Sequence, residues 1–218
     1  MFLFLRSLSR TVHEVHEEHH EEDYVIDEAS YKSLTVWRKS LVLSCNGFTV
    51  IDSEGDLAYR VDNYCEHPSE IILMDGCGKS KFTLCRRKQK LRLVDKWLIY
   101  NDEDDDNNSA DDTKHPILVA KKQINHMLQQ NGNVLAHVYA ATSSNKMHAY
   151  VIEGSYAHRS CKFYDKSRKV VAEIRKKEAA IGGEGVSFGL DVFVLIIRPG
   201  FDQGVAMAIV LLLDQMFS

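Results

Sequence analysis

Paired cysteines and a surplus of basic charge are both missing from this sequence. Five cysteines are scattered without a C-x-x-C pair, which favours reduced thiols in an intracellular protein over a disulfide framework. The formal net charge of -4 argues against direct nucleic-acid binding. We therefore expect an intracellular, cytoplasmic protein, and leave open peripheral attachment to the plasma membrane or a nuclear location.

No apolar run is long enough to cross a bilayer. From Gly204 to Leu213, ten residues lack a charge or a strong hydrogen-bonding side chain, whereas a spanning helix needs about 20 apolar residues. The apolar start of the chain, MFLFL, is shorter than the core of a signal peptide and has no cleavage-site pattern after it. We therefore expect no transmembrane segment.

A catalytic constellation is also missing. Residues 76–80 (GCGKS) end like a phosphate-binding loop, but Leu73 replaces the first glycine and the segment joins two expected strands. Residues 185–189 (GVSFG) match the G-x-S-x-G pattern of serine hydrolases, but no histidine follows His158 in the chain. No carboxylate pair stands out for acid–base chemistry. We expect neither an enzyme nor a cofactor.

Residues 1–30 form a polar leader rich in histidine and glutamate, which we expect to be disordered. His13, His16 and His20 fall on one face of a helix, an arrangement that can converge on a metal ion. Nothing apolar nearby would fix their geometry, and charged runs are usually solvated. We therefore expect no metal site.

From Tyr31 onward, short alternating runs are separated by Gly, Asn, Asp and Ser, a texture typical of β-hairpins in sequence order. In residues 81–85, Phe82 and Leu84 face one way while the polar residues between them face the other. About twelve such strands must bury one face and leave no open edge, and closure into an antiparallel barrel achieves both. Two loops are expected: an acidic one at 101–113 and a glycine-rich one at 176–189.

The last part of the chain predicts a strand and then a helix. Residues 191–200 are rich in β-branched residues, which predicts a strand buried on both faces or nearly so. Asp202 is a suitable N-cap, and a helix of about four turns can follow over 203–217. Its apolar residues surround the axis, so the helix is buried either in protein or in lipid. Because the helix is too short to span a bilayer, we predict that it is buried in protein, inside the barrel. Residues 31–218 are then one domain.

Basic residues concentrate between Lys79 and Lys96, where one acid, Asp95, accompanies eight bases. Lys81, Lys90 and Arg92 share the outward phase of neighbouring expected strands, so we expect a surface patch. Such a patch can hold anionic lipid headgroups, with each near-surface base adding about 1 kcal/mol. The alternative is a solvated face with the acidic loop folded over it as a counterweight. The candidate lipid-binding residues are Lys79, Lys81, Arg86, Arg87, Lys88, Lys90 and Arg92. Lys121 and Lys122 are candidates to extend this patch.

Four segments together resemble the plant LURP-one-related family: residues 34–64, 72–88, 160–177 and 189–216. The resemblance covers the chain from about Tyr31 to Phe217. That family is similar in fold to the tubby C-terminal domain and the phospholipid scramblases. It implies a twelve-stranded barrel around a hydrophobic C-terminal helix, in agreement with the pattern of the residues. No catalytic residues carry over, and the phosphoinositide-binding residues of tubby cannot be placed by motif.

The resemblance implies a non-enzymatic binding module related to membrane-tethered, tubby-like transcription regulators, with a role in plant defence or stress signalling. The partners implied are anionic phospholipid or phosphoinositide headgroups, together with unidentified proteins. The alternative is a protein-interaction scaffold that binds no lipid. Lipid scrambling ranks last, because a short helix buried in a barrel gives lipid no apolar path through a bilayer.

Overall fold

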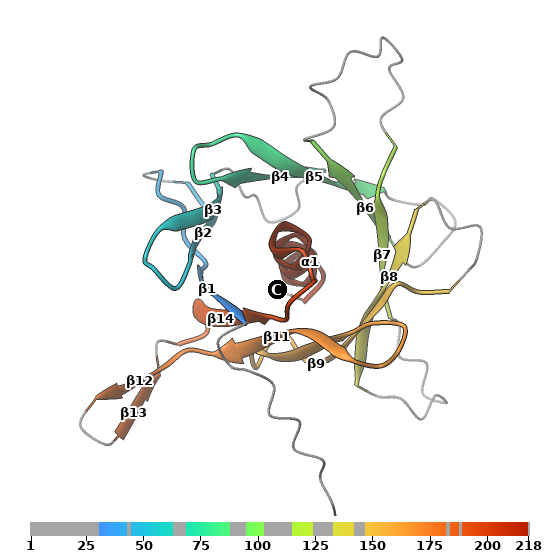
Figure 1. The fold of residues 1–218 in the computed structure, drawn as a ribbon. Coiled ribbons are helices and arrows are strands. Elements are labelled where there is room, and N and C mark those ends of the chain that lie inside the picture. Colours follow the sequence, from blue (N-terminus) through green and yellow to red (C-terminus); the bar gives the residue numbers. More distant parts are fainter. Residues whose placement is uncertain are drawn as a thin grey trace, which may run out of the picture.

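The computed structural model describes residues 31–42, 45–62, 69–87, 95–102, 115–123, 133–141, 147–181, 184–187 and 189–217. Twelve antiparallel strands close into a barrel, and one helix lies along its interior (Figure 1). The sequence predicted this closed β-barrel of about twelve strands with a central C-terminal helix, and the prediction is confirmed. The His/Glu leader, residues 1–30, lies outside the described residues.

The barrel strands pair mostly in sequence order. They are β1 (Lys32–Trp37), β2 (Phe48–Ile51), β3 (Leu57–Val61), β4 (Glu70–Asp75), β5 (Ser80–Arg87), β6 (Lys96–Asn101), β7 (Leu118–Lys122), β8 (Val134–Ala140), β9 (Tyr150–Ser155), β10 (Ser160–Tyr164), β11 (Val170–Lys176) and β14 (Val192–Ile197). The last strand, β14, pairs with β11 on one side and with β1 on the other. This pairing closes the sheet, so the barrel wall has no open edge.

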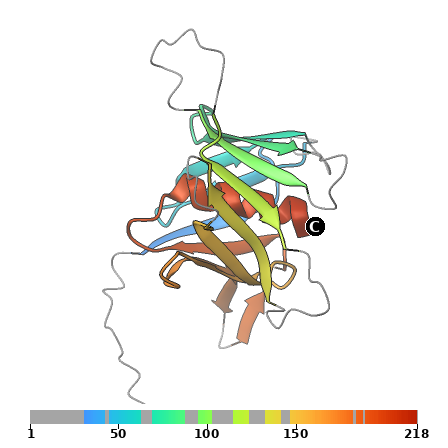
Figure 2. The same cartoon turned by 90° about the vertical axis from the view of Figure 1, so that its right-hand side faces the viewer.

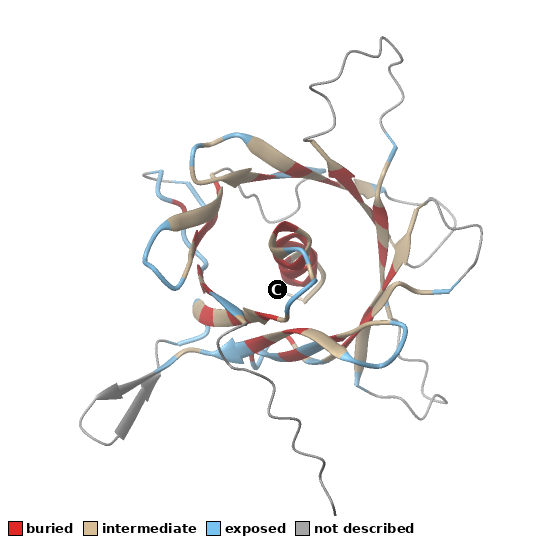
Figure 3. Ribbon diagram, in the orientation of Figure 1, coloured by how far each residue is buried: buried red, intermediate tan, exposed pale blue. Residues whose placement is uncertain are grey.

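Buried residues alternate with less buried ones along many of the strands (Figure 3). In β5, Phe82 and Leu84 are buried, as their spacing predicted, while the residues between them are only partly covered. In β14, Phe193, Leu195 and Ile197 are buried, but the residues between them are covered only in part. The expectation that this strand is buried on both faces therefore holds fully only for the inner one.

The helix α1 (Gln203–Phe217) provides the other half of the core. Asp202 caps it as predicted: its Oδ1 accepts a hydrogen bond from Val205 N at 2.7 Å. Residues 206–214 are all buried, because the barrel surrounds the helix on every side. Fifteen residues make a helix of about 22 Å, close to the length of the strands. Among the described residues, no helix is long and apolar enough to cross a membrane.

The direction of α1 distinguishes the two ends of the barrel (Figure 2). The helix starts at one end of the barrel, which we call the entry end; there β14 ends at Ile197 and β5 begins at Ser80. The C-terminus of the helix lies at the other end, which we call the exit end; there β1 ends at Trp37 and β6 begins at Lys96. Near the entry end, Gly204 lies so close to the Phe82 ring that an added Cβ would approach its Cε2 to 2.4 Å. Helix and wall are thus in tight contact.

A two-stranded ribbon stands apart from the barrel. Strands β12 (Glu178–Ile181) and β13 (Glu184–Ser187) pair with each other and lie outside the wall in Figure 1. The prediction of a glycine-rich loop over 176–189 was therefore wrong. Two glycines separate the strands in the sequence, and a Gly-Gly pair is a frequent hairpin connection.

Candidate functional site

Of the predicted basic residues, the structure describes Lys79, Lys81, Arg86 and Arg87, and it does not gather these four into one patch. Lys79 and Lys81 lie at the entry end of β5 and Arg87 at the exit end, about 20 Å away for six residues of strand. Lys88, Lys90 and Arg92 lie outside the described residues. The sequence showed that these bases were close along the chain, but the length of β5 separates the described ones along the barrel wall.

Two of the predicted residues are in ion pairs. Lys81 Nζ lies 3.8 Å from Asp75 Oδ2. Arg86 Nε donates to Asp95 Oδ2 at 2.8 Å, and its guanidinium carbon lies 5.7 Å from the centre of the Trp97 ring. Arg86 also shares the inward phase of Leu84 and so sits at the rim of the barrel interior. These two bases are already engaged within the protein.

Arg87 instead belongs to a row of cations across the exit end of the wall. Arg87 on β5 is the register partner of Lys96 on β6, and Lys96 is the partner of Lys121 on β7. The inward neighbours Trp97 and Ala120 are buried, so Lys96 and Lys121 point outward. We call Arg87, Lys96 and Lys121 the basic row. Like charges directly opposite each other destabilise a sheet, so folding alone does not favour this arrangement.

The basic row continues into aromatic side chains on β8. Lys121 is paired with His137, and its Nζ lies 4.7 Å from the centre of the Tyr139 ring. The His137 ring lies 5.4 Å from that of His148. Burial lowers the pKa of His137, and the neighbouring His148 lowers it further. This histidine therefore adds little positive charge at neutral pH, and the row rests on its three bases.

Lys122, the next residue, does not extend the row. Its Nζ donates to the carbonyl oxygen of Met216 at 2.5 Å and lies 4.3 Å from the centre of the Phe217 ring. A cation at this position binds a carbonyl of the last helical turn and interacts favourably with the negative end of the helix dipole. Lys122 therefore fastens the end of α1 to the wall.

A buried polar cluster, which the sequence did not reveal, also holds the C-terminal part of α1. Asp214 is fully buried, and its Oδ1 lies 3.0 Å from Arg38 Nε and 3.0 Å from the hydroxyl oxygen of Tyr156. Burial and the Asp214 carboxylate raise the pKa of Tyr156 well above its usual value. The one sequence signal was an acid directly after a long apolar run in a helix. Its arginine partner is far away in the chain.

Arg159 seals this buried cluster from one side. It is 4% exposed, and its guanidinium carbon lies 4.2 Å from the Tyr156 ring centre and 4.6 Å from that of Phe193. Its Nε donates to the carbonyl oxygen of Leu190 at 2.8 Å. With the charges paired and stacked, the cluster is a structural clamp on the helix.

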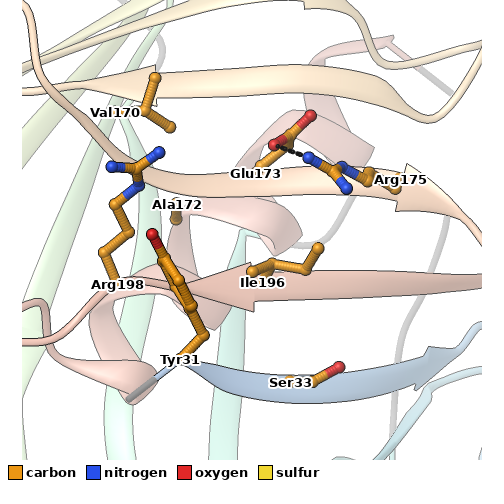
Figure 4. Close-up of a pocket in the computed structure, with 8 residues that line it drawn as sticks. All are labelled: Tyr31, Ser33, Val170, Ala172, Glu173, Arg175, Ile196 and Arg198. Carbon is orange, nitrogen blue, oxygen red and sulfur yellow. Dashed lines mark hydrogen bonds and ion pairs between the residues drawn. The ribbon is translucent and has the colours of Figure 1, made fainter. Parts of the chain in front are cut away.

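A hollow of about 480 Å³ lies on the outside of the wall over β1, β11 and β14 (Figure 4). Tyr31 and Arg198 lie on one side of it, with the guanidinium carbon 5.6 Å from the ring centre. On the other side, Arg175 Nη2 donates to Glu173 Oε2 at 2.8 Å. The remaining lining residues are Ser33, Val170, Ala172 and Ile196. The hollow combines an apolar floor with charged sides.

The two motifs that imitate catalytic loops are parts of strands and turns. At residues 76–80, Gly78 N donates to the carbonyl oxygen of Asp75 at 3.0 Å in the predicted hairpin between β4 and β5. Residues 185–187 lie in β13, and the next element is the strand β14. A nucleophile elbow requires a strand followed by a helix. Neither segment has the context that its motif requires.

Known proteins resemble this chain over its whole length. Residues 32–214 match the LURP-one-related family. The chain is 46% identical to Protein LURP-one-related 17 of Arabidopsis thaliana, with all of both chains covered, and 41% identical to Protein LURP-one-related 8, with 90% and 92% covered. A crystal structure of another Arabidopsis thaliana protein is 19% identical, covers 85% of this chain and 90% of its own, and superimposes with a TM-score of 0.54. The chain belongs to the LURP-one-related family.

Proposed function

We propose that this LURP-one-related chain is a non-enzymatic module that binds anionic phospholipid headgroups through its basic row. The observation that carries the proposal is the register of Arg87, Lys96 and Lys121 on three neighbouring strands. Adjacent strands lie about 4.8 Å apart, so the row offers three cations within reach of one multiply charged headgroup. The similarity of the family to tubby domains, which bind phosphoinositides, supports the same assignment.

Energy considerations favour binding at this row over binding at the entry end of β5. Each base near an anionic surface contributes about 1 kcal/mol, so three bases provide attachment that is weak, reversible and sensitive to salt. Lys81 already has a carboxylate partner in Asp75, which lowers its attraction for a phosphate. Among the described residues, Arg87 and Lys96 form no ion pair. We therefore retain Arg87 among the described candidates and add Lys96 and Lys121, while Lys88, Lys90 and Arg92 lie outside the described residues and stay candidates.

Charge reversal in the row tests this function. Vesicles of phosphatidylcholine with phosphatidylserine and a phosphoinositide should sediment the wild-type protein, and Lys96→Glu with Lys121→Glu should weaken that binding at least about a hundredfold. Lys166→Glu with Lys169→Glu makes the same change of charge in an exposed turn at the entry end and should have little effect. Equal binding by both double variants would refute the role of the basic row.

The hollow beside Tyr31 supports a second candidate function, a protein-interaction scaffold without lipid binding. Its apolar floor and the ion pair on its side would suit a peptide that carries both an apolar and a charged side chain. To distinguish the two functions, protein partners can be captured with the wild-type protein, with Ile196→Glu and with Lys96→Glu, Lys121→Glu. Under this alternative, Ile196→Glu loses partners while Lys96→Glu with Lys121→Glu retains them.

The biological setting that we propose is plant defence or stress signalling. It rests on the resemblance to the LURP-one-related family, whose founding member is linked to pathogen defence. A plant that lacks this gene should then differ from wild type in pathogen growth, and the Lys96→Glu, Lys121→Glu variant should fail to restore it. Full rescue by that variant would separate the biological role from lipid binding.

A further inference from the structure

Large apolar side chains are exposed mainly at the exit end of the barrel. Of the six exposed large hydrophobic residues in the described part of the chain, four lie there: Trp37, Leu41, Val42 and Leu190. Trp37 ends β1, and Leu41 and Val42 follow in the segment that leaves this strand. We call these four residues the apolar tip. They are 39–52% exposed, and contact between these apolar side chains and water is unfavourable in free energy.

Backbone contacts hold the parts of the tip together. Trp37 is the register partner of Val192, two residues after Leu190. The next residue along β1, Arg38, donates its backbone N–H to the carbonyl oxygen of Asp191 at 2.8 Å. The carbonyl oxygen of Leu190 itself accepts the bond from the buried Arg159. The segments that carry Trp37 and Leu190 are therefore held together where β1 ends and β14 begins.

Cations accompany the apolar tip. Lys39 Nζ lies 5.2 Å from the centre of the Trp37 ring. The basic row and Lys122 lie at the same end of the barrel, on β5, β6 and β7, which is the side of the barrel across from β1 and β14 (Figure 1). Four acids at this end are held in ion pairs with arginines, namely Asp62, Asp95, Asp191 and Asp214. In the described part of the chain, the exit end therefore combines exposed apolar groups with bases, and these four of its acids are already paired with arginines.

This combination suits a membrane surface better than water or a protein partner. Tryptophan prefers the boundary between headgroups and acyl chains, and lysine beside it can keep its charge among the headgroups. Most of the expected acidic loop lies outside the described residues, but the chain leaves the described part at Asp102 and returns at His115, both at the entry end of β6 and β7. Charge thus favours one orientation, with the exit end toward an anionic surface.

We propose that the exit end docks on the membrane with the apolar tip inserted among the lipid headgroups and the barrel axis directed away from the surface. This inference rests on the proposed lipid binding and adds to it a depth and an orientation. The basic row supplies attraction from solution, and Trp37 and Leu190 supply the contact with lipid that slows departure. Residues 206–214 of α1 are buried, and in this proposal the helix stays inside the barrel.

The two tryptophans of the chain make a direct test possible, because Trp97 is 2% exposed and only Trp37 faces outward. On addition of phosphatidylcholine vesicles that contain phosphatidylserine and a phosphoinositide, Trp37 emission should shift to the blue. Lipids brominated near the start of the acyl chain should quench it. Trp37→Phe should abolish both signals, since it leaves only the buried Trp97.

Affinity gives an independent measurement. Trp37→Ala should weaken vesicle binding about tenfold, because the exposed part of a large apolar side chain no longer contacts lipid. Met147→Ala removes a side chain that is 60% exposed at the entry end and should leave the affinity unchanged. Melting curves of both variants should match wild type, since both sites are exposed.

The outcomes separate the two proposals. Vesicle binding with unchanged Trp37 emission would overturn insertion and leave headgroup binding by the row intact. Loss of a protein partner in Trp37→Ala, with wild-type vesicle affinity, would assign the tip to a protein interface and also overturn insertion. If the protein does not bind the anionic vesicles at all, both proposals fall.

Discussion

The two ends of the barrel use charge in different ways. At the entry end, acids build the turns: Asp52 Oδ1 accepts bonds from Glu54 N and Asp56 N, each at 2.9 Å, and Asp165 Oδ1 accepts from Ser167 N at 2.8 Å. At the exit end, one acid is buried as a clamp on the helix, and three bases stand in register on the surface. The entry-end acids are explained by folding alone, whereas the basic row is not. That difference is the reason to place function at the exit end.

Both ends depend on the helix, so the largest expected effect comes from a charge in the middle of α1. Ala208→Asp or Leu212→Asp places a lone carboxylate where the wild-type side chain is 0–1% exposed. The loss of unfolding free energy should exceed about 4 kcal/mol and should unfold the whole domain. Circular dichroism and chemical denaturation measure it. If such a variant stayed folded and only lost its membrane attachment, the helix would be an anchor and not a core element.

Removal of the clamp should have the next largest effect. Asp214→Ala leaves Arg38 and the Tyr156 hydroxyl without their shared partner, and the expected loss is about 3 kcal/mol. The matched control is Asp191→Ala. Its side chain is 72% exposed and lies 3.9 Å from the same arginine, so it should change stability little. Urea denaturation of both variants measures the difference, and equal losses would show that the buried pair is not a clamp.

Tyr156→Phe tests the same buried cluster through the pH dependence of stability. The lost hydrogen bond to Asp214 should cost about 1.5 kcal/mol at neutral pH. The raised pKa of Tyr156 means that folding favours the protonated phenol. Its contribution is therefore complete below pH 10 and falls as the pH rises from there toward the folded pKa. Above pH 10, wild type should lose stability faster than Tyr156→Phe in parallel denaturation series. Parallel curves for the two proteins would contradict the raised pKa.

An acid at the entry end should matter less than Asp214. Asp202→Ala removes the cap from α1, which leaves the backbone N–H of Val205 without its 2.7 Å acceptor. The expected loss is about 1 kcal/mol, since water can replace part of an exposed cap. Asp202→Asn retains an acceptor and is the matched control, and thermal melts of the two proteins measure the difference. A loss as large as that of Asp214→Ala would remove the contrast between the ends.

The smallest expected effect has the opposite sign. Lys96→Glu places a carboxylate between Arg87 and Lys121, replaces two repulsive cross-strand pairs with attractive ones and should stabilise the fold by about 0.5 kcal/mol. The same change should weaken vesicle binding. A gain in stability together with a loss of binding would identify the row as a functional feature maintained against folding. A stability loss, measured by denaturation, would mean that the row is structural.

Local patterns made much of the fold predictable. Alternation assigned Phe82 and Leu84 to the inside of β5, and the apolar run after Asp202 predicted a helix that is surrounded by protein. Both features depend on periodicities of a few residues. The β12–β13 ribbon was missed because its segments are short and rich in alanine and glycine, which are weak indicators of strand.

The functional surface was less predictable, because its members come from different strands. Proximity in the chain grouped Lys79 with Arg87, whereas the register of neighbouring strands places Arg87 beside Lys96 and Lys121. Arg38 and Asp214 meet for the same reason: β1 and α1 lie at opposite ends of the chain and touch only inside a closed barrel. No spacing rule within one segment could have paired them.

The sequence by itself determined that this protein would be a β-barrel filled by its own C-terminal helix. Alternation, turn residues and the apolar run are local properties. Few other architectures bury one face of every strand and all faces of the helix. Only the tertiary structure decided which charges are clamps, which build turns and which remain on the surface. The physical reason is that pairing depends on strand register and barrel closure, and these bring together residues that the sequence keeps far apart.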